Sequence, residues 1–110
     1  MQITVRNSGD VKVLDFEGKL DTQTSADAQA RLTQLIDGGE RKLLLNFETL
    51  DYISSAGLRI LLVSAKQLTA AGGELRICCL NEVVREVFEI SGFTTIFNVF
   101  GTEAEALNGF

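Results

Sequence analysis

Two adjacent serines, Ser54 and Ser55, are the residues whose type and position could best support chemistry in this sequence. They lie in the stretch Asp51–Leu58, which reads DYISSAGL, where a predicted buried strand is followed by a predicted helix. The first backbone N–H groups of a helix have no partner within it, and the aligned peptide dipoles place about half a positive charge at that end. An anion such as a phosphoryl group is stabilised there.

Two interpretations of these hydroxyls follow from the local sequence. Either serine can cap the helix by accepting a hydrogen bond from a backbone N–H group, which is the ordinary role of serine at this position. Alternatively, one of them is a phosphoacceptor, because a phosphate adds nearly two negative charges that the helix end tolerates and a docked partner does not. Ala56 and Gly57 add little bulk, so we expect the hydroxyls to be reachable by another protein.

Catalysis by either serine has much weaker support. The chain contains no histidine to act as a general base, and it lacks the Gly-x-Ser-x-Gly pattern of a nucleophile elbow. Neither of the glycine-rich phosphate-binding patterns, G-x-x-x-x-G-K-[ST] and G-x-G-x-x-G, occurs. We therefore predict a regulated binding protein rather than an enzyme, with no cofactor and no metal site.

The elements that must position the serines alternate between strands and helices. The turn sequence Asn7–Asp10 between two short apolar stretches predicts a hairpin. Strands are predicted at residues 3–5, 11–16, 42–47, 75–80 and 96–100, and helices at 26–36, 55–71, 82–90 and after 102. The expected N-caps of three of these helices are Thr24 (or Thr22), Asn81 and Thr102.

This order, β-β-α-β-α-β-α-β-α, predicts an α/β fold formed by a single domain over residues 1–110. The sheet is expected to be mixed, with four to five strands and about four helices packed against it. The continuous apolar run Leu43–Leu45 is typical of an interior strand that is covered on both faces.

Composition excludes several classes of partner. The net charge is −5, and the 10 lysines and arginines are scattered along the chain, so there is no basic stripe for nucleic acid or an anionic membrane surface. The N-terminus lacks a charged region followed by an apolar one, so no signal peptide is expected. The longest apolar run, Ile60–Val63, is too short to span a bilayer. We therefore expect a cytoplasmic protein.

The two cysteines, Cys78 and Cys79, are adjacent within an apolar run. Neighbouring residues in a strand point to opposite faces of the sheet, so a disulfide between them is geometrically poor. We interpret them as small core residues in a reducing compartment. A metal site would need a second cluster of ligands, which the sequence does not offer.

Three short motifs occur together at the spacing found in a known family. Gly18–Asp21 (GKLD) is similar to that family's G-x-[LI]-D after the second strand, and Leu44–Phe47 (LLNF) resembles the end of its third strand. Tyr52–Leu58 (YISSAGL) is similar to its D-S-[ST]-G-L phosphorylation loop. In these motifs, and in the order of its elements, nearly the whole chain resembles the STAS domain of bacterial anti-sigma factor antagonists.

The resemblance implies a mechanism. In this family the unphosphorylated antagonist binds an anti-sigma factor and thereby releases the sigma factor, which regulates transcription. The anti-sigma factor is also the serine kinase and supplies the ATP, phosphorylation breaks the complex, and a separate serine phosphatase restores it. Carried over by position, the phosphoacceptor is Ser55, with Asp21 close to it in the first loop and Asn46 at the end of the neighbouring strand.

The sequence departs from the family at the residue before the acceptor, where an acid is replaced by Ser54, and at the residue after it, which is Ala56. Ser54 is therefore a second candidate acceptor. The residues expected to contact the partner are Asp21, Asn46, Ser54, Ala56 and Gly57.

Two other functions remain open at this point. The missing acid slightly favours a STAS scaffold that is not phosphorylated, acting as an accessory subunit of a transporter or a sensory complex. A nucleotide sensor is the third hypothesis, which the lack of a phosphate-binding loop disfavours. Each hypothesis is compatible with a weak homodimer.

Overall fold

The computed structural model describes all residues from Met1 to Phe110 and confirms the α/β class and the predicted order of elements. The strands are β1 (Gln2–Ser8), β2 (Val11–Leu20), β3 (Lys42–Ile53), β4 (Glu74–Cys78) and β5 (Asn98–Phe100). The α-helices are α1 (Ser25–Asp37), α2 (Ser55–Ala70), α3 (Glu82–Ile90) and α4 (Glu103–Leu107), and η1 (Phe93–Thr95) is a short 3-10 helix. None of the helices combines the length and the apolar character needed to cross a membrane.

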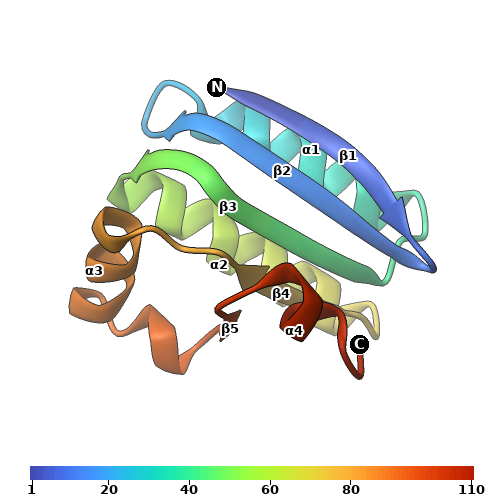
Figure 1. The fold of residues 1–110 in the computed structure, drawn as a ribbon. Coiled ribbons are helices and arrows are strands. Elements are labelled where there is room, and N and C mark those ends of the chain that lie inside the picture. Colours follow the sequence, from blue (N-terminus) through green and yellow to red (C-terminus); the bar gives the residue numbers. More distant parts are fainter.

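The five strands form one mixed sheet in which their spatial order is the same as their order in the chain (Figure 1). β1 and β2 form the predicted antiparallel hairpin, whose turn contains Gly9 with a φ of 61°. The other neighbouring strands are parallel, and a helix connects each pair. Parallel crossovers are almost always right-handed, so a sheet that grows in one direction receives its connecting helices on one face.

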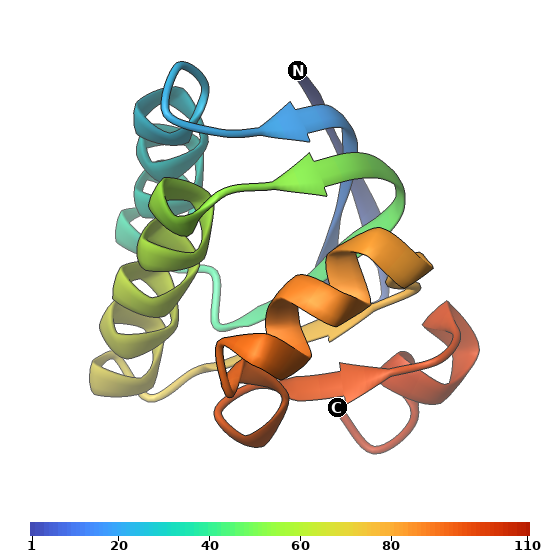
Figure 2. The same cartoon turned by 90° about the vertical axis from the view of Figure 1, so that its left-hand side faces the viewer.

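The main hydrophobic core lies between this face of the sheet and helices α1, α2 and α3. Figure 2 shows α1 and α2 running side by side along the sheet. Leu32 of α1, Leu61 of α2 and Phe88 of α3 meet Leu45 of β3 in a single buried cluster. These large side chains are fully buried, and burying one of them stabilises a fold by about 1.5–3 kcal/mol.

The opposite face of the sheet has a second, smaller core. Val11, Val13, Leu44 and Cys78 are buried there against Ala106 of α4. β3 therefore contributes to both cores, which confirms the prediction that its leucine run is an interior strand.

Every strand has at least one boundary that differs from the prediction, and β2 and β3 are the most extended, with β2 continuing past Phe16 to Leu20. β3 does not end near Phe47 but continues to Ile53, paired with β2 alone after its pairing with β4 ends at Asn46. The register between β2 and β3 shifts twice along this extension, and such irregularities bend strands. At the other end of the sheet, β5 begins only at Asn98, because Ile96 and Phe97 lie in the turn that follows η1.

Two of the predicted N-caps are confirmed. The side chain of Asn81 accepts a hydrogen bond from Val84 N (2.8 Å), and the side chain of Thr102 accepts one from Glu105 N (3.2 Å). Helix α3 has the predicted bounds because its cap and its apolar spacing both lie within a short segment of chain.

Thr24 occupies the N-cap position of α1, but the predicted capping bond is wrong. Its hydroxyl instead donates to the carbonyl oxygen of Lys19 (2.9 Å) and accepts from the backbone N–H of Asp21 (2.9 Å). The threonine thus stabilises the loop before the helix rather than the helix itself.

Helix α4 is held to the sheet by a network of charged and polar groups. The guanidinium of Arg6 donates to Asp15 (2.5 Å) and to Glu103 (2.6 Å), and the amide of Asn46 donates to Glu103 (2.9 Å). The hydrogen bonds from Arg6, and secondarily from Asn46, lower the pKa of Glu103 below its ordinary value against the opposing effect of burial.

The residues after α4 are fixed by a second arginine. The guanidinium of Arg76 donates to the carbonyl oxygens of Ala106, Asn108 and Gly109 at 2.9–3.0 Å. It also lies 4.3 Å from the ring centroid of Phe110, which is a cation–π contact. The bond to Ala106 satisfies a carbonyl that the helix leaves without a partner at its end, and the other two bonds satisfy carbonyls of the residues that follow.

We predict that the Arg6–Glu103 pair makes the docking of α4 sensitive to acid. A carboxylate whose pKa is lowered in the folded state stabilises that state at pH values above its ordinary pKa of about 4.3. This contribution is lost as the pH falls through the pKa of the folded state. Between about pH 7 and about pH 3, wild type should lose about 0.5–1 kcal/mol more unfolding free energy than Glu103→Gln. Urea titration at both pH values measures this difference.

The matched control is Glu105→Gln, a substitution on the exposed side of the same helix. The unfolding free energy of this variant should depend on pH as that of wild type does. Equal pH dependence of all three proteins would contradict the assigned role of Glu103.

Candidate functional site

Ser54 and Ser55 lie at the junction of β3 and α2, and the structure gives them different roles. Ser54 is the N-cap: its backbone is extended and its hydroxyl oxygen accepts a hydrogen bond from Gly57 N (3.3 Å). Ser55 is the first residue of α2, its side chain is exposed, and its hydroxyl has no partner within the chain. The helix therefore begins with one hydroxyl in use and one that solvent can reach.

The loop that contains Asp21 lies beside this junction, because β2 and β3 are parallel and end at the same edge of the sheet (Figure 2). Leu20 pairs with Ile53, and the N–H of Ser54 donates to the carbonyl oxygen of Leu20 (2.9 Å). The structure thus brings Asp21 and the two serines to one place, as the sequence predicts.

Asp21 is occupied mainly in shaping its own loop. Its carboxylate accepts hydrogen bonds from the backbone N–H groups of Gln23 (3.0 Å) and Thr24 (3.2 Å). An aspartate that accepts from the residues two and three positions on is a common way to fix a tight turn. Asp21 is half-buried, so part of its surface also remains available to a partner.

Gly57 was expected to contact a partner, and the structure contradicts this expectation. The residue is buried, and a Cβ atom built on it would lie 2.7 Å from the carbonyl oxygen of Leu20 and 2.8 Å from Cγ1 of Ile53. Glycine is needed here because the first turn of α2 passes directly against the ends of β2 and β3. Ala56, in contrast, is half-buried and keeps an accessible surface.

The expected position of Asn46 is also wrong. Asn46 lies in the middle of β3, where it is only 7% exposed, and its amide donates to Glu103 of α4. Side chains alternate along a strand, so Leu45 faces the main core while Leu44 and Asn46 face α4. Asn46 therefore belongs to the network that fixes α4 and lies on the other side of the sheet from the core beneath α2.

A shallow groove of about 320 Å³ lies beside Ser55. It is lined by Ser55, Leu58, Arg59 and Leu62 of α2, by Ser91 after α3, and by Phe93 of η1. Arg59 stands four positions after Ser55, which places both side chains on one face of the helix. Ser91 and Phe93 could not be assigned to this site from the sequence, because only the folded chain brings the end of α3 against α2.

Aromatic packing connects the groove with the middle of the main core. Phe93 packs edge-on against Phe88 with ring centroids 6.1 Å apart, and Phe88 packs in the same way against Phe47 at 6.4 Å. Phe97, by contrast, is buried and contacts both Phe88 and Phe93. The wall of the groove that faces α2 is therefore anchored by the core and has a defined shape.

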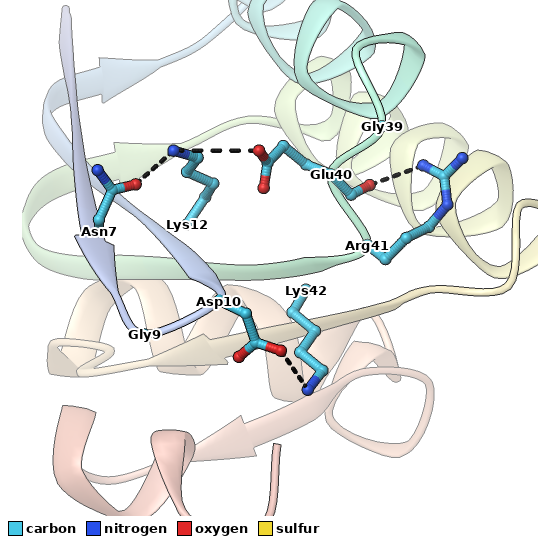
Figure 3. A pocket seen from close by; sticks show the side chains of 8 residues that line it. All are labelled: Asn7, Gly9, Asp10, Lys12, Gly39, Glu40, Arg41 and Lys42. Carbon is cyan, nitrogen blue, oxygen red and sulfur yellow. Dashed lines mark hydrogen bonds and ion pairs between the residues drawn. The ribbon is translucent and has the colours of Figure 1, made fainter.

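A polar hollow of about 380 Å³ lies at the opposite end of the strands, between the β1–β2 turn and the α1–β3 loop (Figure 3). Its cationic groups all have partners within the chain. Lys42 pairs with Asp10 (2.9 Å), Lys12 contacts Asn7 and Glu40, and Arg41 donates to the backbone. In open parallel sheets, ligands bind beyond the carboxyl ends of the strands, and this hollow lies beyond the other ends.

Comparison with known proteins identifies the class of protein that this fold and site define. The family model described as "STAS domain" matches residues 2–106. BtrV of Bordetella bronchiseptica, provisionally named as an anti-sigma factor antagonist, is 41% identical over 110 residues, which cover 100% of this chain and 95% of BtrV. The chain therefore belongs to the STAS domain family.

Solved structures agree with this assignment at the level of the fold. A crystal structure of a Thermotoga maritima protein, also provisionally titled an anti-sigma factor antagonist, superimposes with a TM-score of 0.91 at 20% identity, covering 96% of this chain and 91% of that one. The anti-sigma factor antagonist SpoIIAA in its unphosphorylated form gives a TM-score of 0.74 at 22% identity, covering 97% and 96%. SpoIIAA of Bacillus has also been solved in the phosphorylated form, with a TM-score of 0.73 at 24% identity and 97% coverage of both chains.

We predict that Ser54 and Ser55 contribute differently to stability. Ser54→Ala removes the side-chain cap of α2 and should lower the free energy of unfolding by about 1 kcal/mol. Ser55→Ala, the matched control one residue away, should change it by less than about 0.5 kcal/mol, because its hydroxyl has no partner. Urea denaturation followed by circular dichroism compares the two; equal losses would contradict the assigned cap.

The close contact at Gly57 leads to a second prediction. Gly57→Ala forces a methyl group against a backbone carbonyl that cannot move away easily, and should destabilise the protein by about 1–3 kcal/mol. The sign of this stability change is informative, because replacing glycine by alanine stabilises a helix by about 1 kcal/mol where space is available.

Gly101→Ala is the control for this substitution. Its added Cβ would meet only Glu105 Oε1, at an ordinary contact distance of 3.5 Å. In thermal unfolding, the midpoint temperature of Gly57→Ala should therefore be well below that of Gly101→Ala. A Gly57→Ala variant as stable as wild type would show that the helix start can move away from the strands.

Proposed function

We propose that this protein is an anti-sigma factor antagonist that acts as one STAS domain over residues 1–110. In its unphosphorylated form it binds an anti-sigma factor that is also a serine kinase, and the sigma factor is released. Phosphorylation of Ser55 ends the interaction, and a serine phosphatase reverses the modification. The protein itself catalyses no step of this cycle.

One observation supports Ser55 over Ser54 as the acceptor: only the hydroxyl of Ser55 is exposed and without a partner. The oxygen of Ser54 already accepts from Gly57 N, and phosphorylating it would disturb the helix cap. A kinase needs the acceptor oxygen within reach of the phosphoryl donor, and Ser55 offers this without any rearrangement of the chain.

The substitution of the family's acid by Ser54 is compatible with this proposal. Serine and aspartate are both good N-cap residues, because each presents an oxygen to the first N–H groups of the helix. Ser54 therefore keeps the start of α2 in place while removing one negative charge beside the acceptor. We infer that the partner kinase does not require an acid at this position.

The electrostatics around Ser55 suit a phosphate in the free protein. The first turn of α2 contains no acidic residue, the helix presents its positive end, and Arg59 follows four positions later. A phosphate at this position should therefore be tolerated by the fold. The negative charge and its hydration would instead oppose a partner surface that must come close to the helix start.

The surface beside Ser55 has the apolar character of a docking site. Ile90, adjacent to the groove residue Ser91, is 80% exposed, and the half-buried rings and side chains of Phe93 and Leu62 line the groove itself. Apolar surface that remains accessible at a groove is typical of protein interaction sites. This surface supports binding of an anti-sigma factor across α2 and the end of α3.

The proposal is tested with the purified cognate anti-sigma factor kinase, ATP and Mg²⁺, followed by mass-spectrometric mapping of the modified residue. Ser55→Ala should abolish phosphorylation, whereas Ser54→Ala should retain it. Ser55→Asp should weaken binding of the anti-sigma factor at least about tenfold in a calorimetric titration, a difference of about 1.4 kcal/mol.

Phosphorylation that persists in Ser55→Ala but disappears in Ser54→Ala would move the acceptor to Ser54. Phosphorylation of both variants would reject Ser55 as the single acceptor. If Ser55→Asp binds the anti-sigma factor as tightly as wild type does, the proposal that negative charge at this position weakens binding is rejected.

The alternative function, a STAS scaffold that is not phosphorylated, is favoured only by the missing acid before Ser55. It differs from the proposal in the partner it predicts. Affinity capture with the wild-type protein from its native host should recover a serine kinase under the proposal. The scaffold would be favoured by two results together: capture of a transporter or sensory complex, and no modification of the protein when it is incubated with the candidate kinase.

A further inference from the structure

The backbone at the end of β4 has an unusual conformation. The strand ends at Cys78, and Cys79 has a φ of 65°, the only positive φ at a residue other than glycine. This left-handed conformation is costly for a residue with a side chain, and it interrupts the alternation of a strand. The expectation that the two cysteines point to opposite faces is therefore wrong.

Both cysteine side chains lie on the side of the sheet that α4 covers. Cys78 is fully buried in the second core with Leu44 and Ala106, and Cys79 packs against the same cluster. Cys79 also lines a hollow of about 490 Å³ beside α4, together with Asn46 and Glu103. Burial and, to a smaller extent, the neighbouring thiol of Cys79 raise the pKa of Cys78.

A direct disulfide does not suit this pair, and both cysteines are free thiols. The Cα atoms of adjacent residues are about 3.8 Å apart across a trans peptide, which is shorter than the roughly 4.4–6.8 Å that most disulfides span. A single atom placed between the two sulfurs would make the ring larger and relieve this strain. The pair is thus better arranged to hold one soft atom than to form a sulfur–sulfur bond.

The surroundings also limit which soft ligand fits. No group of three or more His, Cys, Asp or Glu side chains is arranged to hold a metal ion. A tetrahedral zinc site, which needs four ligands, is therefore not formed here. A ligand that is satisfied by two thiols matches the donors that are present.

We propose that Cys78 and Cys79 form a vicinal dithiol site that binds thiophilic ligands needing two sulfur donors, of which monosubstituted trivalent arsenicals are the matching chemical class. With phenylarsine oxide, C₆H₅AsO, two As–S bonds form and both S–H bonds break. The two protons leave with the arsenical oxygen as one molecule of water. No oxidation or reduction takes place.

Access to the site depends on α4. Cys78 lies beneath Ala106, so an incoming ligand reaches Cys79 from the hollow first and reaches Cys78 only when α4 moves. Glu103 is the side chain that holds α4 to Arg6 and Asn46. Weakening this contact should therefore speed up formation of the two-thiol adduct.

The test uses the folded protein of residues 1–110 with equimolar phenylarsine oxide, analysed by intact-mass spectrometry during a challenge with glutathione. These are the only two cysteines in the chain, so no other thiol interferes. Wild type should keep the adduct at glutathione concentrations at least about 100-fold higher than either Cys78→Ala or Cys79→Ser, because the second thiol acts at high effective concentration. Dithiothreitol, which has two thiols, should release the adduct.

Circular dichroism tests whether each variant is folded. If Cys78→Ala does not fold, the comparison is made with Cys79→Ser alone. Equal resistance of wild type and the single variants would overturn the proposal. So would an adduct that forms in guanidinium chloride but not in the folded protein.

The role of α4 is tested by the rate of adduct formation. Glu103→Gln should react several-fold faster than wild type, and Glu105→Gln, on the exposed side of the same helix, should react at the wild-type rate. Equal rates for Glu103→Gln and Glu105→Gln would overturn the dependence on α4.

Discussion

The candidate site depends on the close contact between the start of α2 and the ends of two parallel strands. The N–H of Ser54 donates to the carbonyl oxygen of Leu20, and Gly57 leaves just enough room for the helix to pass that same oxygen. Together these contacts fix the direction in which α2 leaves the sheet. They therefore also fix where Ser55 is presented and how the Asp21 loop lies beside it.

Local features of the site could be predicted from the sequence, whereas features that depend on sheet register could not. The bounds of α3 and the caps at Asn81 and Thr102 are set by residues a few positions apart, and these predictions are correct. The environment of Asn46 is decided by which face of β3 it occupies and by a helix 57 residues later in the chain. The burial of Gly57 likewise depends on the end of β2, and the groove residue Phe93 depends on how η1 packs against α2.

The two faces of the sheet are covered by different means. The face that carries α1, α2 and α3 is closed mainly by large apolar side chains, including a set of contacting phenylalanines. The other face has an apolar cluster of only five buried residues and depends on polar anchoring of α4 through Arg6 and of the following residues through Arg76. Hydrogen-bonded charges at the surface contribute less stability than an apolar core, so the second face is the one more easily opened.

Ser55 already belongs to a helical turn in the free protein. Under the proposed function, the kinase does not receive a flexible strand that it can draw into its catalytic cleft, but the rigid end of a folded element. Its specificity must then be read from a three-dimensional surface formed by several segments of the chain. A short peptide copying residues 51–58 has neither the helix nor its neighbours, because isolated segments of this length do not hold a helix in water. Such a peptide would be a poor substrate even though it contains every residue of the motif.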